Sequence, residues 1–472
     1  MHQKLWDVIQ VFIFHLHFIS LRISIFGFST TYVNTPVNQF KAYINESLIK
    51  RDVVMTAANY DTIWNIFLNI WFVGFFLGIW LSPILNDRYG RKVGFLTGNS
   101  VAFLASILQC VAIYWFVPEL LIVARFMTSV CMAVTYQSCI LYIQECSPTH
   151  LRGFMTFLSE VSFSTMTLFG SILGTQGVLG NHLFWLVFFV VPFCFIFLVG
   201  LIFLPETPKF LLIVKRDNDA AIKSVRFYHG PCVDAKSVLE SIQMEEEEGE
   251  EQTISTSQAL KDLFREPYLR KALMISVSAL QNTVALWALL LSSTYFLENA
   301  NMEPKIAQWS SNSMNFAYVL GAISGTNIIE RWGRRPLLLS FTFANNVALL
   351  AFVLFTALQP LIDWLKYGCL AALIVYGYTY GCGVGPISWF ISSELVPQKY
   401  RSITQSAAYA INTVMVVISS FTVLPLYSAL GSYAFLLLYS IPSTFSLIFL
   451  FRALPETKGR EVYDIVKQLR GK

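Results

Sequence analysis

The sequence predicts an all-α membrane protein of twelve transmembrane helices arranged as two repeated halves. Three observations support this prediction: the composition, the spacing of the apolar stretches, and three charged motifs that each occur twice. Of the 472 residues, 55% are hydrophobic and 13% are charged, and the mean hydropathy is +0.56. A water-soluble domain carries about 25% charged residues, so most of this chain is expected to lie in lipid.

Apolar stretches of about 20 residues, each long enough to cross a bilayer as a helix, occur twelve times. The predicted spans are residues 9–33, 62–85, 93–116, 119–143, 154–178, 183–204, 270–297, 307–329, 337–358, 364–392, 403–426 and 431–453. A long polar segment separates the sixth span from the seventh. We therefore predict one six-helix bundle at 9–204, a central loop with short helices at 205–269, a second six-helix bundle at 270–453 and a tail at 454–472.

Lysine and arginine gather on one side of the predicted spans. With the N-terminus inside, 26 of the 33 basic residues fall in the tails and loops of the inner side, whereas four fall outside. Because cytoplasmic loops retain positive charge, both termini, the central loop and the tail are predicted to be cytoplasmic. The first external loop then contains the one Asn-x-Ser/Thr sequon of the chain, which makes Asn45 a predicted glycosylation site.

Three motifs recur six spans apart. Residues 86–92 after the second span read N-D-R-Y-G-R-K, and residues 330–335 after the eighth read E-R-W-G-R-R. Glu145 after the fourth span and Glu394 after the tenth are each followed by proline three residues later and arginine seven residues later. The sequence Pro-Glu-Thr ends both the sixth and the twelfth span. Three pairs in matching positions indicate two structural repeats.

These motifs resemble those of the sugar porter family of the major facilitator superfamily. The resemblance is strongest to the facilitative hexose transporters of animals, and it extends from about Phe26 to the last Pro-Glu-Thr motif. It implies the major facilitator fold, with two pseudo-symmetric six-helix bundles in a multi-pass protein of the plasma membrane. The expected partners are the lipid bilayer and a small-molecule substrate, a monosaccharide, and the protein is expected to work as a monomer.

Charged residues at the inner ends of the two bundles are expected to bridge when that side closes. The predicted gating residues are Asp87, Arg88, Arg91, Glu145, Arg152 and Glu206 in the first half and Glu330, Arg331, Arg334, Glu394, Arg401 and Glu456 in the second. Exposed ion pairs contribute about 0.2–1 kcal/mol each. Such a network keeps the inward and outward states within a few kcal/mol of each other, as a switch requires.

A hexose carries hydroxyl groups that both donate and accept hydrogen bonds, so its site should use neutral amides and an aromatic face. From polar residues inside spans, and from matching positions in the family, the predicted substrate-binding residues are Phe26, Thr30, Gln176, Gln281, Asn282, Trp389 and Asn412. Hydrogen bonding between helices is an alternative role for Gln176. Gly385 and Pro386 are expected to break span ten, so that Trp389 faces a cavity.

Other positions depart from the family pattern. Trp287 stands where the family has an amide, and Tyr318, Thr413 and Val416 replace further pocket residues. The predicted substrate is therefore a hexose or a related small polar solute, and a fructose-like, polyol or more apolar solute stays open. Ser29 stands where the proton symporters of the family have aspartate. Its hydroxyl does not titrate near neutral pH, which predicts uniport.

No enzymatic or nucleic-acid-binding pattern occurs in the sequence. Metal-ligand spacing, a P-loop and a dense basic cluster are missing, so we predict no enzyme activity, no cofactor, no metal site and no nucleic-acid partner. Two other functions stay open: a transport-inactive sugar sensor or scaffold with this fold, and a transporter of a non-sugar solute such as an organic anion. Arg22, His15 and His17 are unusual in a lipid-facing span, and Arg22 is expected to face the bundle or to extend toward the interface.

Overall fold

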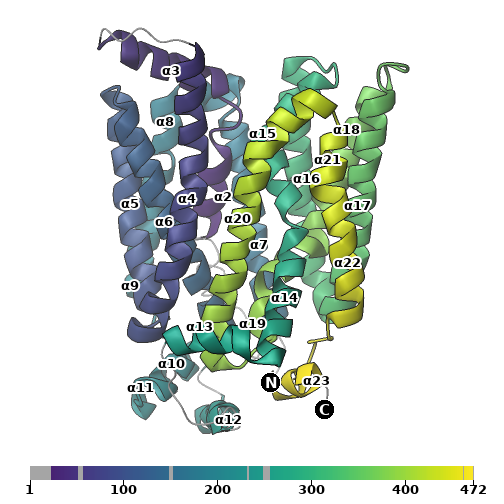
Figure 1. Ribbon diagram of the computed structural model, residues 1–472. Helices are drawn as coiled ribbons and strands as arrows, with labels where there is room; N and C mark the ends of the chain where they lie inside the picture. The colour runs from purple at the N-terminus through teal and green to yellow at the C-terminus, as the bar shows by residue number, and fades with distance from the viewer. Residues whose placement is uncertain are drawn as a thin grey trace.

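The computed structural model describes residues 23–51, 57–147, 152–230, 233–247, 256–460 and 462–470. Within these ranges all regular structure is helical. Figure 1 shows two groups of long helices side by side, with short helices gathered at one end. His15, His17 and Arg22 lie outside the described residues.

The first group contains the helices that precede residue 205. Its members are α2 (Ile23–Thr31), α3 (Val37–Ile49), α4 (Ala57–Tyr89), α5 (Arg91–Tyr114), α6 (Pro118–Cys146), α7 (Arg152–Leu173), η1 (Gln176–Gly180), α8 (Leu183–Phe188) and α9 (Val190–Ile202). The short helix α3 lies at the end away from the other short helices (Figure 1). Its residue Asn45 is exposed, and it lies in this helix rather than in an irregular loop.

The second group begins with a helix that is interrupted near its middle. Its members are α14 (Pro267–Gln281), α15 (Val284–Asn299), α16 (Pro304–Trp332), α17 (Arg334–Leu358), α18 (Leu365–Thr379), η2 (Tyr380–Val384), α19 (Gly385–Glu394), α20 (Gln398–Leu430), α21 (Tyr433–Phe435), η3 (Leu436–Ser440) and α22 (Ile441–Ala453). Across the two groups, α4 packs against α20 and α7 packs against α16. The repeat relates α4 to α16 and α7 to α20, so these are two copies of one contact.

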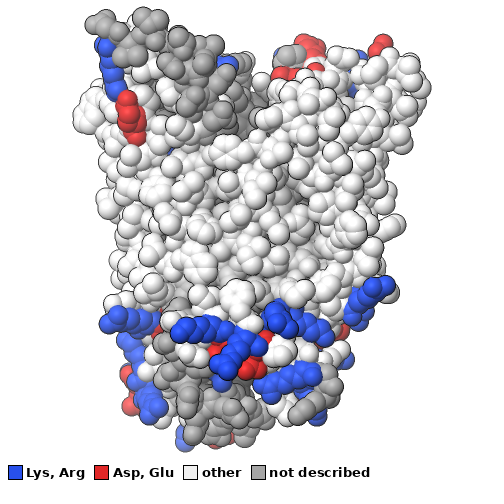
Figure 2. Space-filling view, viewed as in Figure 1, with Lys and Arg blue, Asp and Glu red and all other residues white. Residues whose placement is uncertain are grey.

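Short helices cover one end of both groups. They are α10 (Pro208–Ile213), α11 (Asn218–His229), α12 (Ala235–Glu247), α13 (Thr256–Arg265) and α23 (Val462–Arg470). A small apolar core that includes Leu211, Val225 and Leu239 holds α10, α11 and α12 together. Figure 2 shows a band of Lys and Arg at this end, which we call the basic end. The end that carries α3 is called the opposite end.

The predicted fold class, twelve transmembrane helices in two bundles, is confirmed. Nine helical segments within the described ranges are long and apolar enough to cross a membrane. The other three predicted spans are represented by the described part of the first span in α2, by the apolar stretch Phe157–Leu173 of α7, and by the 29-residue helix α16. Several predicted spans are composite helices. One or two residues interrupt the sixth and seventh spans, and a π-helical turn of five residues lies within the tenth and the twelfth.

Span ten is distorted but not broken open, contrary to the expectation for Gly385 and Pro386. Proline has no N–H and crowds the carbonyl four residues earlier. The π-helical turn η2 precedes Pro386, which stands in the first turn of α19. A π turn accommodates the proline without ending the helix, so the backbone continues through the membrane in helical form.

Glycines bring α2 and α7 into close contact. A Cβ atom on Gly27 would lie 2.3 Å from the carbonyl oxygen of Phe163. On α7, a Cβ on Gly170 would lie 2.5 Å from Thr31 Oγ1. The approach lets the Thr31 hydroxyl donate to the carbonyl of Thr167 at 3.0 Å. Small residues permit such backbone contact between membrane helices, where apolar burial drives association weakly.

We predict that Gly27→Ala destabilises the protein by about 1–3 kcal/mol, the usual cost of overpacking, because the new methyl group would meet backbone atoms of α7. The measurement is the unfolding temperature of the purified protein in detergent. Gly177→Ala is the matched control, since a Cβ there meets nothing within 4 Å. Equal unfolding temperatures for the two variants would contradict the proposed tight contact.

Candidate functional site

Aromatic rings from both halves meet at the centre of the membrane region. We call them the central aromatic cluster; all are buried, and they are Phe26, Trp71, Phe75, Tyr136, Phe163, Trp287, Tyr318, Tyr380, Trp389 and Tyr409. Phe26 stacks on Trp71 at 5.5 Å and contacts Trp287 of the second half at 6.1 Å. Each buried ring contributes a large apolar area, so the cluster is a main contact between the halves.

Two of the predicted substrate-binding residues lie in this cluster. Phe26 and Trp389 both contact Tyr136, with ring centroids 5.5 Å away in each case. Trp389 also packs edge-on against Tyr409 at 4.9 Å. Trp287 and Tyr318, which depart from the family pattern, belong to the same cluster. These departures therefore place rings where the resemblance implies amides.

The predicted polar residues of the second half lie close to the interruption between α14 and α15. Asn282 bonds to Ser443 and Ser446 of α22, at 2.8 and 3.0 Å. Asn412 of α20 donates to the carbonyl of Leu280 at 2.9 Å. The last carbonyls of a helix lack partners within it, and a membrane supplies none. Asn412 thus adds a hydrogen bond at a helix end where the Thr283 hydroxyl donates to the same carbonyl at 2.7 Å. The half-buried Gln281 is the last residue of that helix.

The remaining predicted substrate residues belong to the first half. Thr30 is buried and donates to the carbonyl of Gly27 at 2.7 Å. Gln176 is exposed, because α7 ends at Leu173 and the side chain falls in the turn η1 at the opposite end. Its carbonyl accepts a hydrogen bond from Asn181 at 3.0 Å. The structure therefore does not bring Gln176 to the central aromatic cluster.

Two buried charged residues inside the bundle were not among the predicted site residues. Glu160 of α7 accepts a hydrogen bond from the hydroxyl of Tyr318 in the second half. Arg125 of α6 is 3% exposed, lies 4.9 Å from the ring of Phe67, and donates to the carbonyl of Ser29 at 3.4 Å. Each stands alone in a long apolar run, and that isolation is the sequence signal that could have identified it.

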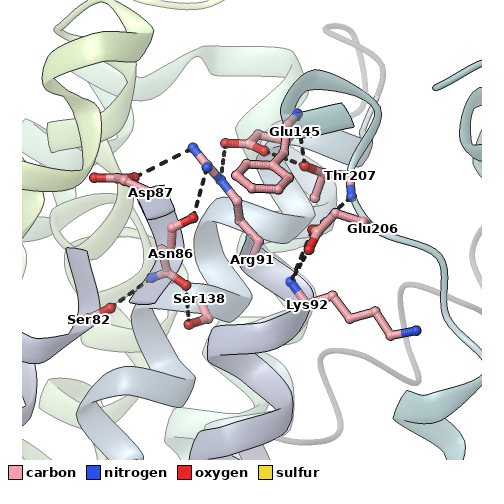
Figure 3. Close-up of polar contacts among 10 residues, drawn as sticks. Ser82, Asn86, Asp87, Arg91, Lys92, Ser138, Glu145, Glu206 and Thr207 are labelled. Atoms are coloured by element: carbon pink, nitrogen blue, oxygen red, sulfur yellow. Dashed lines mark hydrogen bonds and ion pairs between the residues drawn. The ribbon is translucent and has the colours of Figure 1, made fainter. Parts of the chain in front are cut away.

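At the basic end of the first half, two glutamates hold three helix ends together (Figure 3). Glu145 pairs with Arg91 Nε at 2.9 Å and accepts a hydrogen bond from the Thr207 hydroxyl at 2.7 Å. Glu206 accepts from the backbone N–H of Lys92 at 3.0 Å. A carboxylate is favourable there because the first N–H groups of a helix carry positive partial charge. Burial nevertheless raises the pKa of Glu206 above its ordinary value.

The second half repeats this arrangement. Glu394 lies 3.5 Å from Arg334 Nε and accepts a hydrogen bond from the Thr457 hydroxyl at 2.6 Å. Glu456 accepts from the backbone N–H of Arg334 at 2.9 Å. The glycine before each clamped helix has positive φ, +110° at Gly90 and +92° at Gly333, which favours glycine. We call these two arrangements the clamps, and each contains residues from all three paired motifs.

The described ion pairs among the predicted gating residues join helices of the same half. Asp87 lies 3.8 Å from Arg91, Arg88 and Arg331 are exposed, and Arg401 is buried. The side chains of Arg152 and Glu330 lie outside the described side chains. Between the halves, the Ser406 hydroxyl donates to Gln137 at 3.1 Å near the basic end. Bridges between the two sets of gating residues stay a prediction.

Two six-helix bundles, a shared central interface and a clamp on each bundle define a membrane transporter of the major facilitator fold. Residues 17–469 match the model of a family described as "Sugar (and other) transporter". The chain belongs to this family, as its motifs indicated. Members of the family are transporters, so the chain is a multi-pass membrane transporter and not an enzyme.

Curated relatives match over nearly the whole chain. Facilitated glucose transporter member 1 of solute carrier family 2 from Gallus gallus is 27% identical over 453 residues, covering 94% of this chain and 90% of the relative. Member 3 from the same organism is 28% identical over 451 residues, covering 93% and 88%. The resemblance to animal facilitative hexose transporters is therefore confirmed.

Solved structures share the fold at lower identity. The proton:xylose symporter XylE bound to 6-bromo-6-deoxy-D-glucose is 15% identical, with a TM-score of 0.80, covering 97% of this chain and 99% of that one. The inward-open xylose transporter XylE from E. coli is also 15% identical, with a TM-score of 0.70 over the same shares.

A double-mutant cycle tests the clamp. Arg91→Met and Glu145→Gln should show a coupling free energy of about 2 kcal/mol, because contacting residues of one buried network are not additive. The measurement is denaturant unfolding in detergent. The control cycle is Arg51 with Glu119, whose side chains are 38% and 62% exposed at 2.6 Å; such pairs couple by less than about 1 kcal/mol. Equal coupling in both cycles would contradict a clamp.

Proposed function

We propose that the protein carries a hexose or a related small polar solute across a membrane by alternating access, as a uniporter. The observation that supports this most directly is the central aromatic cluster, which both bundles build at the middle of the membrane. Sugar rings have apolar faces that suit aromatic side chains, while hydroxyl groups need donors and acceptors at the edges. Membership of the sugar transporter family supports the same function.

Contacts between the halves occur on both sides of this cluster. Toward the opposite end, the Ser171 hydroxyl donates to Asn312 at 2.5 Å, and Asn34 donates to the carbonyl of Leu290. Toward the basic end, Ser406 bonds to Gln137. A single hydrogen bond contributes about 0.5–1.5 kcal/mol, so either set can break at modest cost. In alternating access, one set opens while the other holds.

We propose that the clamps keep each bundle rigid while the halves move against each other. They join helix ends within one half, so they can persist in every state of the cycle. Rigid-body motion about a fixed central site is the usual form of this mechanism. The residues predicted as a gate would then act first as braces, with any bridges between the halves added when the basic end is closed.

The proposed uniport rests on the site of Ser29. Its hydroxyl donates to the carbonyl of Phe26 at 2.9 Å, and it does not titrate near neutral pH. We also propose that the basic end faces the cytoplasm of a cell whose plasma membrane holds the protein, because positive charge is retained inside. In that orientation Asn45 lies outside, where it can carry a glycan. The boundaries 9–204, 205–269, 270–453 and 454–472 are the proposed division of the chain.

Purified protein in proteoliposomes should equilibrate labelled D-hexoses and leave L-glucose outside. The panel includes polyols, urate and organic anions. Trp389→Leu should lower sugar uptake at least about tenfold, since a large buried aromatic contact is lost. Trp309→Leu is the matched control, because Trp309 is 54% exposed on the outer surface of α16. If no solute moves, a sensor or scaffold replaces this proposal; if only organic anions move, the sugar assignment is wrong.

Uniport predicts sugar uptake without proton movement. A pH-sensitive dye inside the vesicles should report no acidification during uptake, and an imposed pH gradient should not accumulate sugar above its outside concentration. Ser29→Asp is the informative variant, because it adds a titratable group at the position where family symporters carry one. Proton influx that tracks sugar uptake in the unmodified protein would contradict the proposal.

A further inference from the structure

Glu160 is a carboxyl group buried between the two halves. It lies on α7 and is 5% exposed. The hydroxyl of Tyr318, from α16 of the other half, donates to Oε1. Gly385 of α19 is also adjacent, since a Cβ there would lie 2.9 Å from the same oxygen. The group therefore stands at the contact of three helices, next to the central aromatic cluster.

The described neighbours of Glu160 include no positive charge. Its titratable neighbours are four tyrosines, each from a different element, namely Tyr136, Tyr318, Tyr380 and Tyr409. Among the described residues, the Tyr318 hydroxyl donates to Oε1 of this carboxyl, and Oε2 has no described donor. Arg125, a buried cation on α6 of the same half, contacts Phe67 and Ser29 instead.

An unpaired buried carboxylate is costly. Removing an ion from water carries a large free-energy cost unless an opposite charge and hydrogen bonds replace the water. One neutral hydroxyl replaces a small part of that hydration. Two kinds of cation would offset this cost when the halves close: a proton, or a positive group of the ligand.

The surrounding rings favour a ligand cation. The faces of Trp and Tyr attract ammonium groups, most strongly where water is excluded, whereas a proton on the carboxyl would make no use of them. Tyr136, Trp389 and Tyr409 are mutually in contact, with centroids between 4.9 and 6.1 Å apart. Tyr136 and Tyr409 also interact electrostatically with Glu160, so this carboxyl and the rings can act together on an amine. An anionic solute, by contrast, would be repelled.

We propose that Glu160 binds the ammonium group of an amino sugar, so that the transported solute is a hexose carrying a cationic amine. The inference rests on the proposed sugar transport and adds the chemical class of the substrate. It assigns a specificity-determining role to Glu160. This residue belongs to no sequence motif, and the fold places it beside the central aromatic cluster. It also disfavours uronates and other organic anions as substrates.

The test uses the full chain in proteoliposomes preloaded with unlabelled sugar. Exchange is measured for D-glucosamine, D-glucose, N-acetyl-D-glucosamine and D-glucuronate. The unmodified protein should prefer glucosamine over glucose by about tenfold or more, because hydrogen bonds between charged partners are the strong ones. N-acetylglucosamine keeps the nitrogen but loses the charge, so it should behave like glucose, and glucuronate should move least.

Two substitutions separate charge from shape. Glu160→Gln keeps the size of the side chain and should reduce the glucosamine-to-glucose ratio to about one, whereas Glu160→Asp keeps the charge and should retain a preference for the amine. Glu119→Gln is the control, because this glutamate pairs with Arg51 on the exposed surface at the opposite end; its ratio should be unchanged. Ligand-induced shifts in unfolding temperature provide a second readout for a variant that transports poorly.

The outcomes that overturn the inference are distinct from those that overturn sugar transport. If glucose and glucosamine move equally well in the unmodified protein, the amine proposal fails while the sugar proposal stands. The same holds if Glu160→Gln keeps the ratio, or if it changes only the pH dependence of glucose exchange, which would assign a proton to the site. If none of the sugars moves, the proposed function itself fails.

Discussion

The buried pair of Arg91 and Glu145, with its counterpart Arg334 and Glu394, is the interaction on which the rest of the structure depends. In each half it joins the ends of helices that are far apart in sequence, and a threonine from the Pro-Glu-Thr motif completes it. In lipid, the hydrophobic effect does not drive helices together. A buried polar network at one end is therefore an effective brace. Two braced bundles can then move as units about the contacts that join them.

Those contacts place aromatic rings and one buried carboxyl at the interface between the two halves. Trp287 and Tyr318 depart from the family pattern, yet both belong to the central aromatic cluster. Tyr318 also bonds to Glu160. The replacements are therefore related: a ring that takes the place of an amide also supplies the hydroxyl that faces the carboxyl. A site of this kind has fewer hydrogen-bonding groups than a site built from amides, in line with the proposed preference for a cation.

The helices and the repeat could be predicted from the sequence, whereas the positions of several side chains could not. Phe26 and Trp389 lie at the centre as expected, because each is in the middle of a span. Gln176 does not, because the end of α7 cannot be located from hydropathy when small residues follow it. The described ion pairs of the charged motifs lie within each half, and bridges between the halves stay a prediction. A charged residue in a motif indicates that it needs an oppositely charged partner. The sequence does not show which helix supplies that partner.

The sequence by itself determined the twelve spans, the two repeats and the family, because length, hydropathy and motif spacing are local properties of the chain. Only the tertiary structure decided that α4 meets α20 and α7 meets α16, and that Glu160 faces a tyrosine 158 residues away. The physical reason is that helix packing selects among many neighbours of similar hydropathy through the shapes of small and large side chains. The clamps illustrate both contributions. Their residues are evident as motifs in the sequence, and the packing of the helix ends determines which of these residues pair.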